Sequence, residues 1–308
     1  MRSYTLIAPA KINLYLEIVG ARPDGYHELV MVLQSIDLAD QIHLRTISTD
    51  IIRVRCEHPQ VPTNENNLAY RAAELMSRRF PDAFAQYGGV EITIDKYIPV
   101  AAGLAGGSTD AAAVLVGLNL LWKLGLTQSE LQELAAGLGS DVPFCVTGGT
   151  AIATGRGEQL SPLLSLERLY VVLGKYRSLS VSTAWAYQTY RQQYGQDLKS
   201  RASVQSGPMV QAIIHEDGVQ IGQRLYNDLE RVVLPEYPLV LRLRQAFAST
   251  PVLGAMMSGS GPAVFGLCES YEQAQQVQQH VRASIPEPDL DLWLVRLCST
   301  GIQVASSI

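Results

Sequence analysis

The chain has 308 residues, of which 24 are Lys or Arg and 29 are Asp or Glu, so its formal net charge at pH 7 is −5. This length predicts two domains or one large domain. The acidic balance has the wrong sign for a general binder of phosphate backbones, so we expect no nucleic-acid partner. Apolar residues make up 47% and charged residues 17%, a composition that excludes a disordered chain.

The cysteines and the hydropathy of the sequence indicate the cellular compartment. The cysteines lie far apart without a C-x-x-C pair, which predicts neither a disulfide framework nor a zinc site. The most apolar stretch, residues 111–126, is interrupted by Asn119 and Lys123, so we expect no membrane partner. The N-terminus shows no signal-peptide pattern. We therefore expect a cytoplasmic protein, either a monomer or a homodimer.

The first half of the chain contains several strand patterns. Apolar residues alternate with polar ones from Ala10 to Ile18, a period of two that is typical of a strand. Residues 42–45, 52–56 and 90–94 repeat the alternation. These three segments are predicted to be half-exposed, antiparallel strands.

Helical patterns lie between and after these strands. Asn64 is predicted to cap a helix that contains Leu68, and Thr127 with Glu130 forms a capping box for a later helix. Toward the C-terminus we expect strands at 252–256 and 263–267, a helix at 271–282 and a strand at 292–297. Residues 188–211 are predicted to be an exposed connection or a peripheral helix pair. We place a domain boundary at about 155–162, giving domains 1–158 and 159–308.

A glycine-rich segment at residues 99–113 is the most informative part of the chain. It follows a strand and opens a helix, and its small residues would let the backbone approach a polyphosphate at a helix N-terminus. On glycine content alone, a plain tight turn explains it equally well. A Walker A loop is disfavoured because no lysine precedes Ser108. A dinucleotide fingerprint is disfavoured because residues 97–99 separate the glycines from the strand.

Residues 99–113 resemble the P-x-x-x-G-L-G-G-G-S-S-D-A-A motif of the GHMP kinase superfamily of small-molecule kinases. Ala102, Ala105 and Thr109 depart from it, the first two standing where glycine is frequent and the third where serine is usual. The resemblance implies ATP and Mg²⁺ as cofactors. It also implies that the nucleotide is bound by Pro99, Val100, Ala101, Ala102, Gly103, Leu104, Ala105, Gly106, Gly107, Ser108 and Thr109.

Further blocks narrow the resemblance. The segments A-P-A-K-I-N-L at 8–14 and R-P-D-G-Y-H-E-L at 22–29 are similar to the branch of the superfamily whose acceptor is 4-diphosphocytidyl-2-C-methyl-D-erythritol. Residues 139–144, 226–230 and 254–261 also resemble that branch. The implied fold is a two-domain α+β (mixed α/β) arrangement, with the phosphate loop in the N-terminal domain, a ferredoxin-like C-terminal domain and the active site between them.

Two charged residues are candidates for the chemistry. Lys11 and Asn13 lie two apart on a predicted strand, so their side chains share a face, which without other context would be an ordinary solvated face. Asp141 lies at a predicted helix start, where a simple capping role is the plain interpretation. The resemblance instead implies that Lys11 and Asp141 are catalytic, with Asp141 as general base and Asn13 binding substrate.

The acceptor pocket is expected around residues 26, 27 and 187. Tyr26 and His27 follow an Asp-Gly turn signal and could be a strand-start aromatic and a surface histidine. The resemblance implies that Tyr26 stacks on cytosine and that the segment at His27 hydrogen-bonds its edge, with Tyr187 as the opposite wall. Tyr187 could equally be a core aromatic. Ser108 and Thr109 could reach Mg²⁺ or only cap the helix, so the metal ligands stay open.

The implied activity is ATP-dependent phosphorylation of the 2-hydroxyl of the cytidylated acceptor, a step of the non-mevalonate route to isoprenoid precursors. One alternative is another kinase of the superfamily that acts on mevalonate, homoserine or a sugar. A second is a nucleotide-binding sensor that has kept the fold and lost the chemistry. The D-G-Y-H-E block argues against the first alternative, and the presence of both Lys11 and Asp141 argues against the second.

Overall fold

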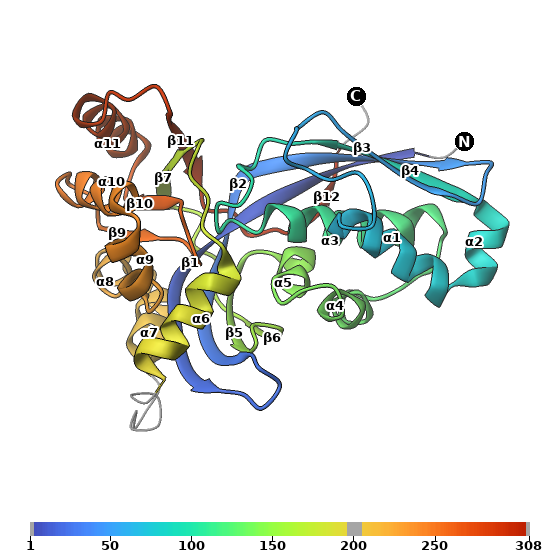
Figure 1. The fold of residues 1–308 in the computed structure, drawn as a ribbon, viewed down its shortest axis with the longest axis horizontal. Coiled ribbons are helices and arrows are strands. Elements are labelled where there is room, and N and C mark those ends of the chain that lie inside the picture. The colour runs from blue at the N-terminus through green and yellow to red at the C-terminus, as the bar shows by residue number, and fades with distance from the viewer. Residues whose placement is uncertain (1–2, 196–204, 306–308) are drawn as a thin grey trace.

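The structure of the chain is a computed structural model that describes residues 3–195 and 205–305 (Figure 1). Two β-sheets, each covered by helices, lie at opposite ends of the molecule. The long strands β1 (Ser3–Ala21) and β2 (His27–Ile47) form a hairpin that runs diagonally from the first sheet past the second. This hairpin therefore belongs structurally to both halves.

The first sheet has the strand order β12-β1-β2-β4-β3, and β5 joins it through β2. The short strands β8 and β12 come from the second half of the chain and pair with β1. The remaining strands of this sheet have the bounds β3 (Ile52–Cys56), β4 (Gly89–Asp95), β5 (Thr150–Gly155), β6 (Gln159–Pro162), β8 (Tyr226–Asn227) and β12 (Gln303–Val304).

The predicted strands of the first half are all present, but one orientation was wrong. β4 is antiparallel to β2, as predicted, whereas β3 is parallel to β4. Two helices, α1 and α2, separate β3 from β4, and such a crossover connection allows parallel pairing. The predicted helix cap was also displaced: Asn67, not Asn64, accepts a hydrogen bond from the amide of Ala69.

Five helices of the described chain lie in this half: α1, α3 and α5 contact the first sheet, whereas α2 packs on α1 and α4 packs on α3 and α5. α3 is buried on nearly all sides because it lies between the sheet, α1 and α5. Gly117 permits this close approach, since a Cβ there would lie 2.1 Å from Cδ1 of Leu44 on β2. The predicted Thr127–Glu130 capping box is confirmed at the start of α4. The bounds are α1 (Leu68–Arg79), α2 (Pro81–Tyr87), α3 (Gly106–Leu121), α4 (Gln128–Ala136) and α5 (Val142–Thr147).

The second sheet is antiparallel, with the order β11-β7-β10-β9. Its strands and two of its helices follow the chain order β-α-β-β-α-β, which is the ferredoxin-like arrangement predicted for this half. The bounds are β7 (Tyr170–Tyr176), β9 (Gly254–Met257), β10 (Val264–Cys268) and β11 (Leu290–Arg296). β6 belongs to the first sheet and β7 to the second. The predicted domain boundary at about 155–162 stays a prediction.

The helices of the second half cover one face of this sheet and flank the hairpin. α10 and α11 pack on β7, β9, β10 and β11. α6 overlaps the start of the 188–211 segment and α7 its end, while residues 196–204 lie outside the described chain. The bounds are α6 (Thr183–Tyr194), α7 (Gly207–Ile214), α8 (Gly218–Gln223), α9 (Glu230–Glu236), α10 (Pro238–Ala248) and α11 (Tyr271–Ser284).

The hairpin fills the other face of the second sheet. Ala10, Ile12 and Leu14 of β1 share a buried cluster with Leu173 and Phe265 of that sheet. A bulge at Leu14 interrupts the alternation predicted for residues 10–18: Asn13 pairs with Leu33 and Tyr15 with Val32. Leu16 and Ile18 consequently join a different cluster from Ile12. This shared core fixes the position of the two halves relative to each other.

Candidate active site

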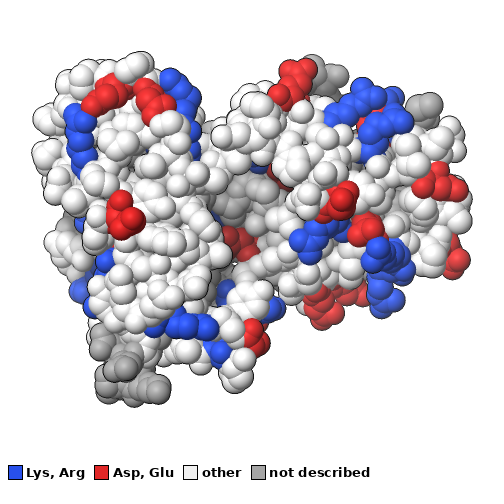
Figure 2. Space-filling model, in the orientation of Figure 1, with Lys and Arg blue, Asp and Glu red and all other residues white. Residues whose placement is uncertain are grey.

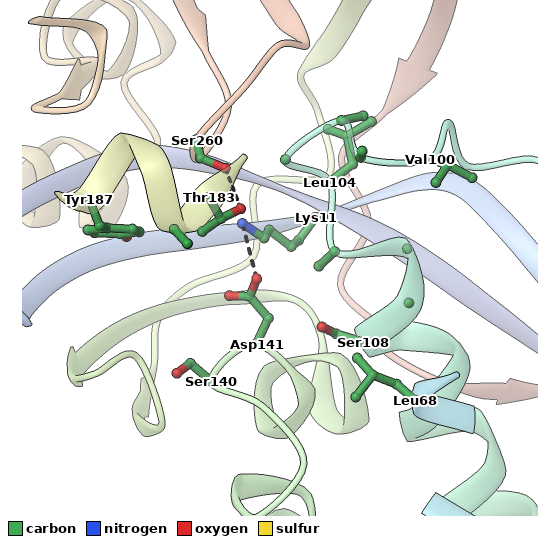
Figure 3. A pocket seen from close by; sticks show the side chains of 18 of the residues that line it. Lys11, Leu68, Val100, Leu104, Ser108, Ser140, Asp141, Thr183, Tyr187 and Ser260 are labelled. Atoms are coloured by element: carbon green, nitrogen blue, oxygen red, sulfur yellow. Dashed lines mark hydrogen bonds and ion pairs between the residues drawn. The ribbon is translucent and has the colours of Figure 1, made fainter. Parts of the chain in front are cut away.

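A cleft of about 1160 Å³ lies where the two halves meet, and the hollow is visible between them in Figure 2. Its walls are the hairpin β1–β2, the glycine-rich loop before α3, the start of α5, helix α6 and the turn between β9 and β10. Figure 3 shows Lys11, Ser108, Asp141 and Thr183, which come from four of these elements, around the same part of the cleft. Segments far apart in the sequence thus build a single cavity.

Lys11 and Asp141 face each other in this cleft (Figure 3). Lys11 Nζ lies 3.6 Å from Oδ2 of Asp141 and donates a 2.7 Å hydrogen bond to Oδ1 of Asn13. The predicted shared face of Lys11 and Asn13 is therefore confirmed. Lys11 and Asn13 are buried, whereas the Asp141 side chain is 30% exposed and open to the cleft. Asp141 is the N-cap residue of α5, so its predicted place at a helix start is confirmed, but its side chain makes no capping hydrogen bond.

The glycine-rich loop is held in place by three hydrogen bonds that its backbone carbonyls accept. The amide of Lys11 donates to the carbonyl of Leu104, Ser258 Oγ donates to the carbonyl of Gly103, and the amide of Ala263 donates to the carbonyl of Ala102. Gly103 has φ +79°, and a Cβ there would lie 2.3 Å from the carbonyl oxygen of Ser258. Only glycine fits this left-handed, crowded position. The loop is thereby fixed against both β1 and the β9–β10 turn.

The loop ends at the N-terminus of α3. Ala105, the N-cap, has φ +58°, and the first amides of the helix have no acceptor within the helix, as at any helix start. These amides and the positive end of the helix dipole favour an anion. The predicted nucleotide-binding residues 99–108 all line the cleft.

Thr109 lies apart from them. Its side chain is fully buried, it does not line the cleft, and its amide donates to the carbonyl of Ala105. Neither Ser108 nor Thr109 caps the helix, because Ala105 is the N-cap. Ser108, by contrast, points toward the space beside Asp141 (Figure 3).

Aromatic residues gather at the other end of the cleft. The rings of His27 and Tyr187 lie 5.3 Å apart between centroids, at an interplanar angle of 32°. Tyr26 is 55% exposed, and the guanidinium of Arg156 lies 5.0 Å from its ring centroid. Tyr187 lines the cleft and also packs against the core, so its role as a wall of the acceptor pocket stays a prediction.

His27 carries an unused polar atom. Its Nε2 is buried and has no hydrogen-bond partner within the described part of the chain. Burial, followed by the nearby Arg191 guanidinium, lowers the pKa of His27, which favours the neutral imidazole. Burial raises the pKa of Tyr187, which keeps that hydroxyl protonated. The neutral imidazole therefore lies against the ring of Tyr187 with its buried Nε2 unpaired within the described residues.

Sequence reasoning missed a buried ionic triad beneath the loop. Lys96 Nζ lies 2.5 Å from Oδ2 of Asp40 and 2.7 Å from Oδ2 of Asp110. A Cβ on Gly106 would lie 3.0 Å from Lys96 Nζ, so the triad sits directly under the first residue of α3. Burial raises the pKa of Asp110 to about 8. Lys96 shortly precedes the glycine-rich segment and Asp110 lies within it, a signal that could have drawn attention to them.

Other contacts of the cleft were also missed. Asn227 donates 2.8 Å hydrogen bonds to the carbonyls of Met257 and Gly259, which secures the β9–β10 turn. Thr183 and Ser260 share a 2.8 Å hydrogen bond that joins the start of α6 to this turn (Figure 3). Arg191, on the same helix, reaches the hairpin tip. The partners in these contacts are distant in sequence, so no local pattern marks them.

Among the described residues, no group of three or more His, Cys, Asp or Glu side chains is arranged to hold a metal ion. Within residues 3–195 and 205–305, no helix combines the length and apolar character needed to cross a membrane.

Comparison with known proteins agrees with this geometry. The model of the GHMP kinases N terminal domain matches residues 67–149, and that of the GHMP kinases C terminal domain matches residues 209–287. A protein of Trichormus variabilis named 4-diphosphocytidyl-2-C-methyl-D-erythritol kinase is 68% identical over 99% of both chains. One of Nostoc punctiforme with the same name is 69% identical over 100% of both chains.

Solved structures show the same fold. The crystal structure of a 4-(cytidine 5'-diphospho)-2C-methyl-D-erythritol kinase has a TM-score of 0.75 at 32% identity, covering 95% of this chain and 98% of that one. A homoserine kinase from Cytophaga hutchinsonii has a TM-score of 0.78 at 19% identity, covering 99% and 98%. The fold alone thus does not select an acceptor. The full-length identities do select a family: the chain belongs to the 4-diphosphocytidyl-2-C-methyl-D-erythritol kinase family of the GHMP kinases.

Proposed function

We propose that the chain transfers the γ-phosphoryl group of ATP to the 2-hydroxyl of 4-diphosphocytidyl-2-C-methyl-D-erythritol, on the non-mevalonate route to isoprenoid precursors. The observation that carries this proposal is the Lys11–Asp141 pair, which lies in one cleft with a glycine-rich helix start and an aromatic pocket. The family supplies the acceptor's identity, and the geometry supplies a place for each part of the reaction.

The nucleotide phosphates would lie against the N-terminus of α3. The amides of Gly106, Gly107 and Ser108 begin that helix, where anions are favoured. The contacts that fix the loop carbonyls keep these amides in place without reorganisation during transfer. Positioning of this kind supplies most of the acceleration in phosphoryl transfer, because little covalent work is left to the protein.

The acceptor hydroxyl would lie beside Asp141. As the oxygen attacks phosphorus and the bond to ADP breaks, the Asp141 carboxylate takes the hydroxyl proton. The Lys11 ammonium, 3.6 Å from that carboxylate, faces the charge that develops on the transferred group. Asn13 holds Lys11 by accepting its hydrogen bond.

The cytosine ring would occupy the aromatic end. Tyr26 offers a ring face, and Tyr187 stacks on His27 to form a second wall. The partnerless Nε2 of His27 provides a polar group for the edge of a base. Mevalonate, homoserine and sugars present no such ring, so this end of the cleft favours a cytidylated acceptor over theirs.

Mg²⁺ would enter with ATP. The residues fit this role, because the ion usually keeps several waters and takes one or two carboxylates or hydroxyls besides the phosphates. The Ser108 hydroxyl and the Asp141 carboxylate are the groups of the cleft that would hold it. When bound, the ion neutralises charge on the phosphates.

The direct test mixes purified protein, ATP and Mg²⁺ with the cytidylated acceptor and measures ADP, with phosphorus NMR of the product. We expect stoichiometric ADP and a new phosphate monoester on the acceptor. ADP formed only with mevalonate, homoserine or a sugar would establish a different kinase. ATP binding without ADP in any mixture would establish a sensor.

A further inference from the structure

The tip of the β1–β2 hairpin has no core of its own. Residues 22–26 are all exposed or partly exposed, and none belongs to a buried cluster. Local polar contacts shape the turn: the amide of Arg22 donates to the carbonyl of Tyr26, and the amide of Tyr26 donates to Oδ1 of Asp24. Segments held only by exposed hydrogen bonds open easily. A second anchor is needed if Tyr26 is to keep a fixed place.

Helix α6 provides that anchor through Arg191. Its Nη2 donates to the backbone carbonyls of Gly25 and Tyr26, the latter at 3.0 Å. The helix itself is well fixed, because Ala186 and Tyr190 are fully buried and Thr183 is hydrogen-bonded to Ser260. The contact therefore ties the movable tip to a rigid element.

The two linked elements carry the opposite walls of the aromatic pocket. Tyr26 lies on the hairpin tip, and Tyr187 lies on α6, one helical turn before Arg191. Residues four apart in a helix lie on the same side, so Arg191 and Tyr187 both face the hairpin. His27, at the base of the tip, already packs on Tyr187, so the Arg191 contact adds the hold on Gly25 and Tyr26 beyond it.

We propose that Arg191 is a positioning residue that sets the width of the base pocket by holding the Tyr26 hairpin against α6. It acts through two backbone carbonyls and not through the acceptor. The inference rests on the proposed function, because it takes the pocket to hold the cytosine of the acceptor. It adds a residue outside the motif blocks to the determinants of acceptor affinity.

The first experiment needs no ligand. Arg191→Met keeps the length and packing of the side chain but cannot donate to the carbonyls. We expect amide hydrogen exchange of a peptide covering residues 22–28 to become several-fold faster, while exchange of the β1–β2 core stays unchanged. The matched control is Gln193→Met, an exposed neighbour on α6 that does not line the cleft. Unchanged exchange in Arg191→Met would overturn the proposal.

The second experiment measures binding of cytidine and of CDP to both variants by calorimetry. If Arg191 acts by positioning, the Kd of each ligand rises by the same factor, roughly tenfold for two lost charge-assisted hydrogen bonds. A rise for CDP alone would mean that the guanidinium binds phosphate directly, which contradicts the proposal. The Kd of ATP should stay unchanged.

Steady-state kinetics complete the test. Arg191→Met should raise the KM for the acceptor while kcat at saturation stays within about twofold, and Arg191→Lys should recover part of the loss because it can still donate to one carbonyl. A fall in kcat with constant KM would overturn the positioning role. If the wild-type protein binds neither cytidine nor CDP, the proposed function fails, whereas the exchange experiment still reports on the tether.

Discussion

The ammonium of Lys11 lies 3.6 Å from the carboxylate of Asp141, although 130 positions separate the two residues. Lys11 comes from the centre of β1, and Asp141 comes from the turn that precedes α5. The carboxylate remains partly open to the cleft while the lysine is buried beneath it. This arrangement leaves the carboxylate able to receive a proton from a ligand.

Asp141→Asn tests that role. The substitution keeps the shape of the side chain and removes its basicity, so turnover should fall by ~10²-fold or more. The Kd values of ATP and the acceptor should change little, because the amide still fills the same space. Steady-state kinetics together with calorimetry measure both quantities. Near-normal turnover in this variant would refute the assignment of Asp141 as general base.

Tyr26→Ala tests the pyrimidine pocket. Removing a stacking face should weaken binding of the acceptor by about 1–3 kcal/mol, on the scale measured for aromatic–base stacking. Tyr26→Phe is the matched control, since it keeps the ring and should bind the acceptor nearly as well as the wild type. Calorimetry with CDP and with ATP separates the two ends of the cleft. If Tyr26→Ala weakens ATP binding and leaves CDP binding unchanged, Tyr26 belongs to the ATP site and the assignment of the pyrimidine pocket is wrong.

Much of the site was predictable because its motifs are contiguous in sequence. The glycine-rich loop, the Lys11–Asn13 pair and the Tyr26–His27 turn are each local patterns, and the structure brings them to one cleft. A local pattern does not show which distant residues its side chains will contact in the folded chain. Arg191 contacts Tyr26 across 165 positions, and nothing in the sequence of α6 marks that arginine among its polar neighbours.

The errors in the fold have a similar origin. Asn64 and Asn67 are both good helix caps, and only the folded turn decides that Asn67 is the one used. Asp141 looked like a cap because its position fits one, but the ion pair with Lys11 takes its side chain. The bulge at Leu14 carries no sequence signal, since it follows from pairing with β2.

Ala105→Gly should stabilise the protein. Ala105 has φ +58°, a left-handed conformation that costs an L-residue roughly 1–2 kcal/mol. Glycine avoids that cost but loses more entropy on folding, so we expect a net gain of about 1 kcal/mol in the free energy of unfolding. Ala112→Gly, within the regular part of α3, is the control of opposite sign: it should lower the free energy of unfolding by about 1 kcal/mol or more, because Ala112 is also fully buried. If urea unfolding shows that both variants change the free energy of unfolding in the same direction, this account of strain at Ala105 is contradicted.

Asp110 should make stability depend on pH. The triad holds two carboxyl groups and one amine out of water, and burial raises the pKa of Asp110 from 3.8 to about 8. Between these values the folded chain holds a proton that the unfolded chain has released. The free energy of unfolding therefore falls as pH rises from about 4 to 8, with a slope of at most about 1.4 kcal/mol per pH unit from this group.

Asp110→Asn cannot titrate, so its free energy of unfolding should fall less steeply than that of the wild type when urea curves are compared from pH 5 to 8. Asp82→Asn, at an exposed position on α2, controls for the loss of one charge. Parallel pH profiles for the wild type and Asp110→Asn would show that this carboxyl is already ionised in the folded protein.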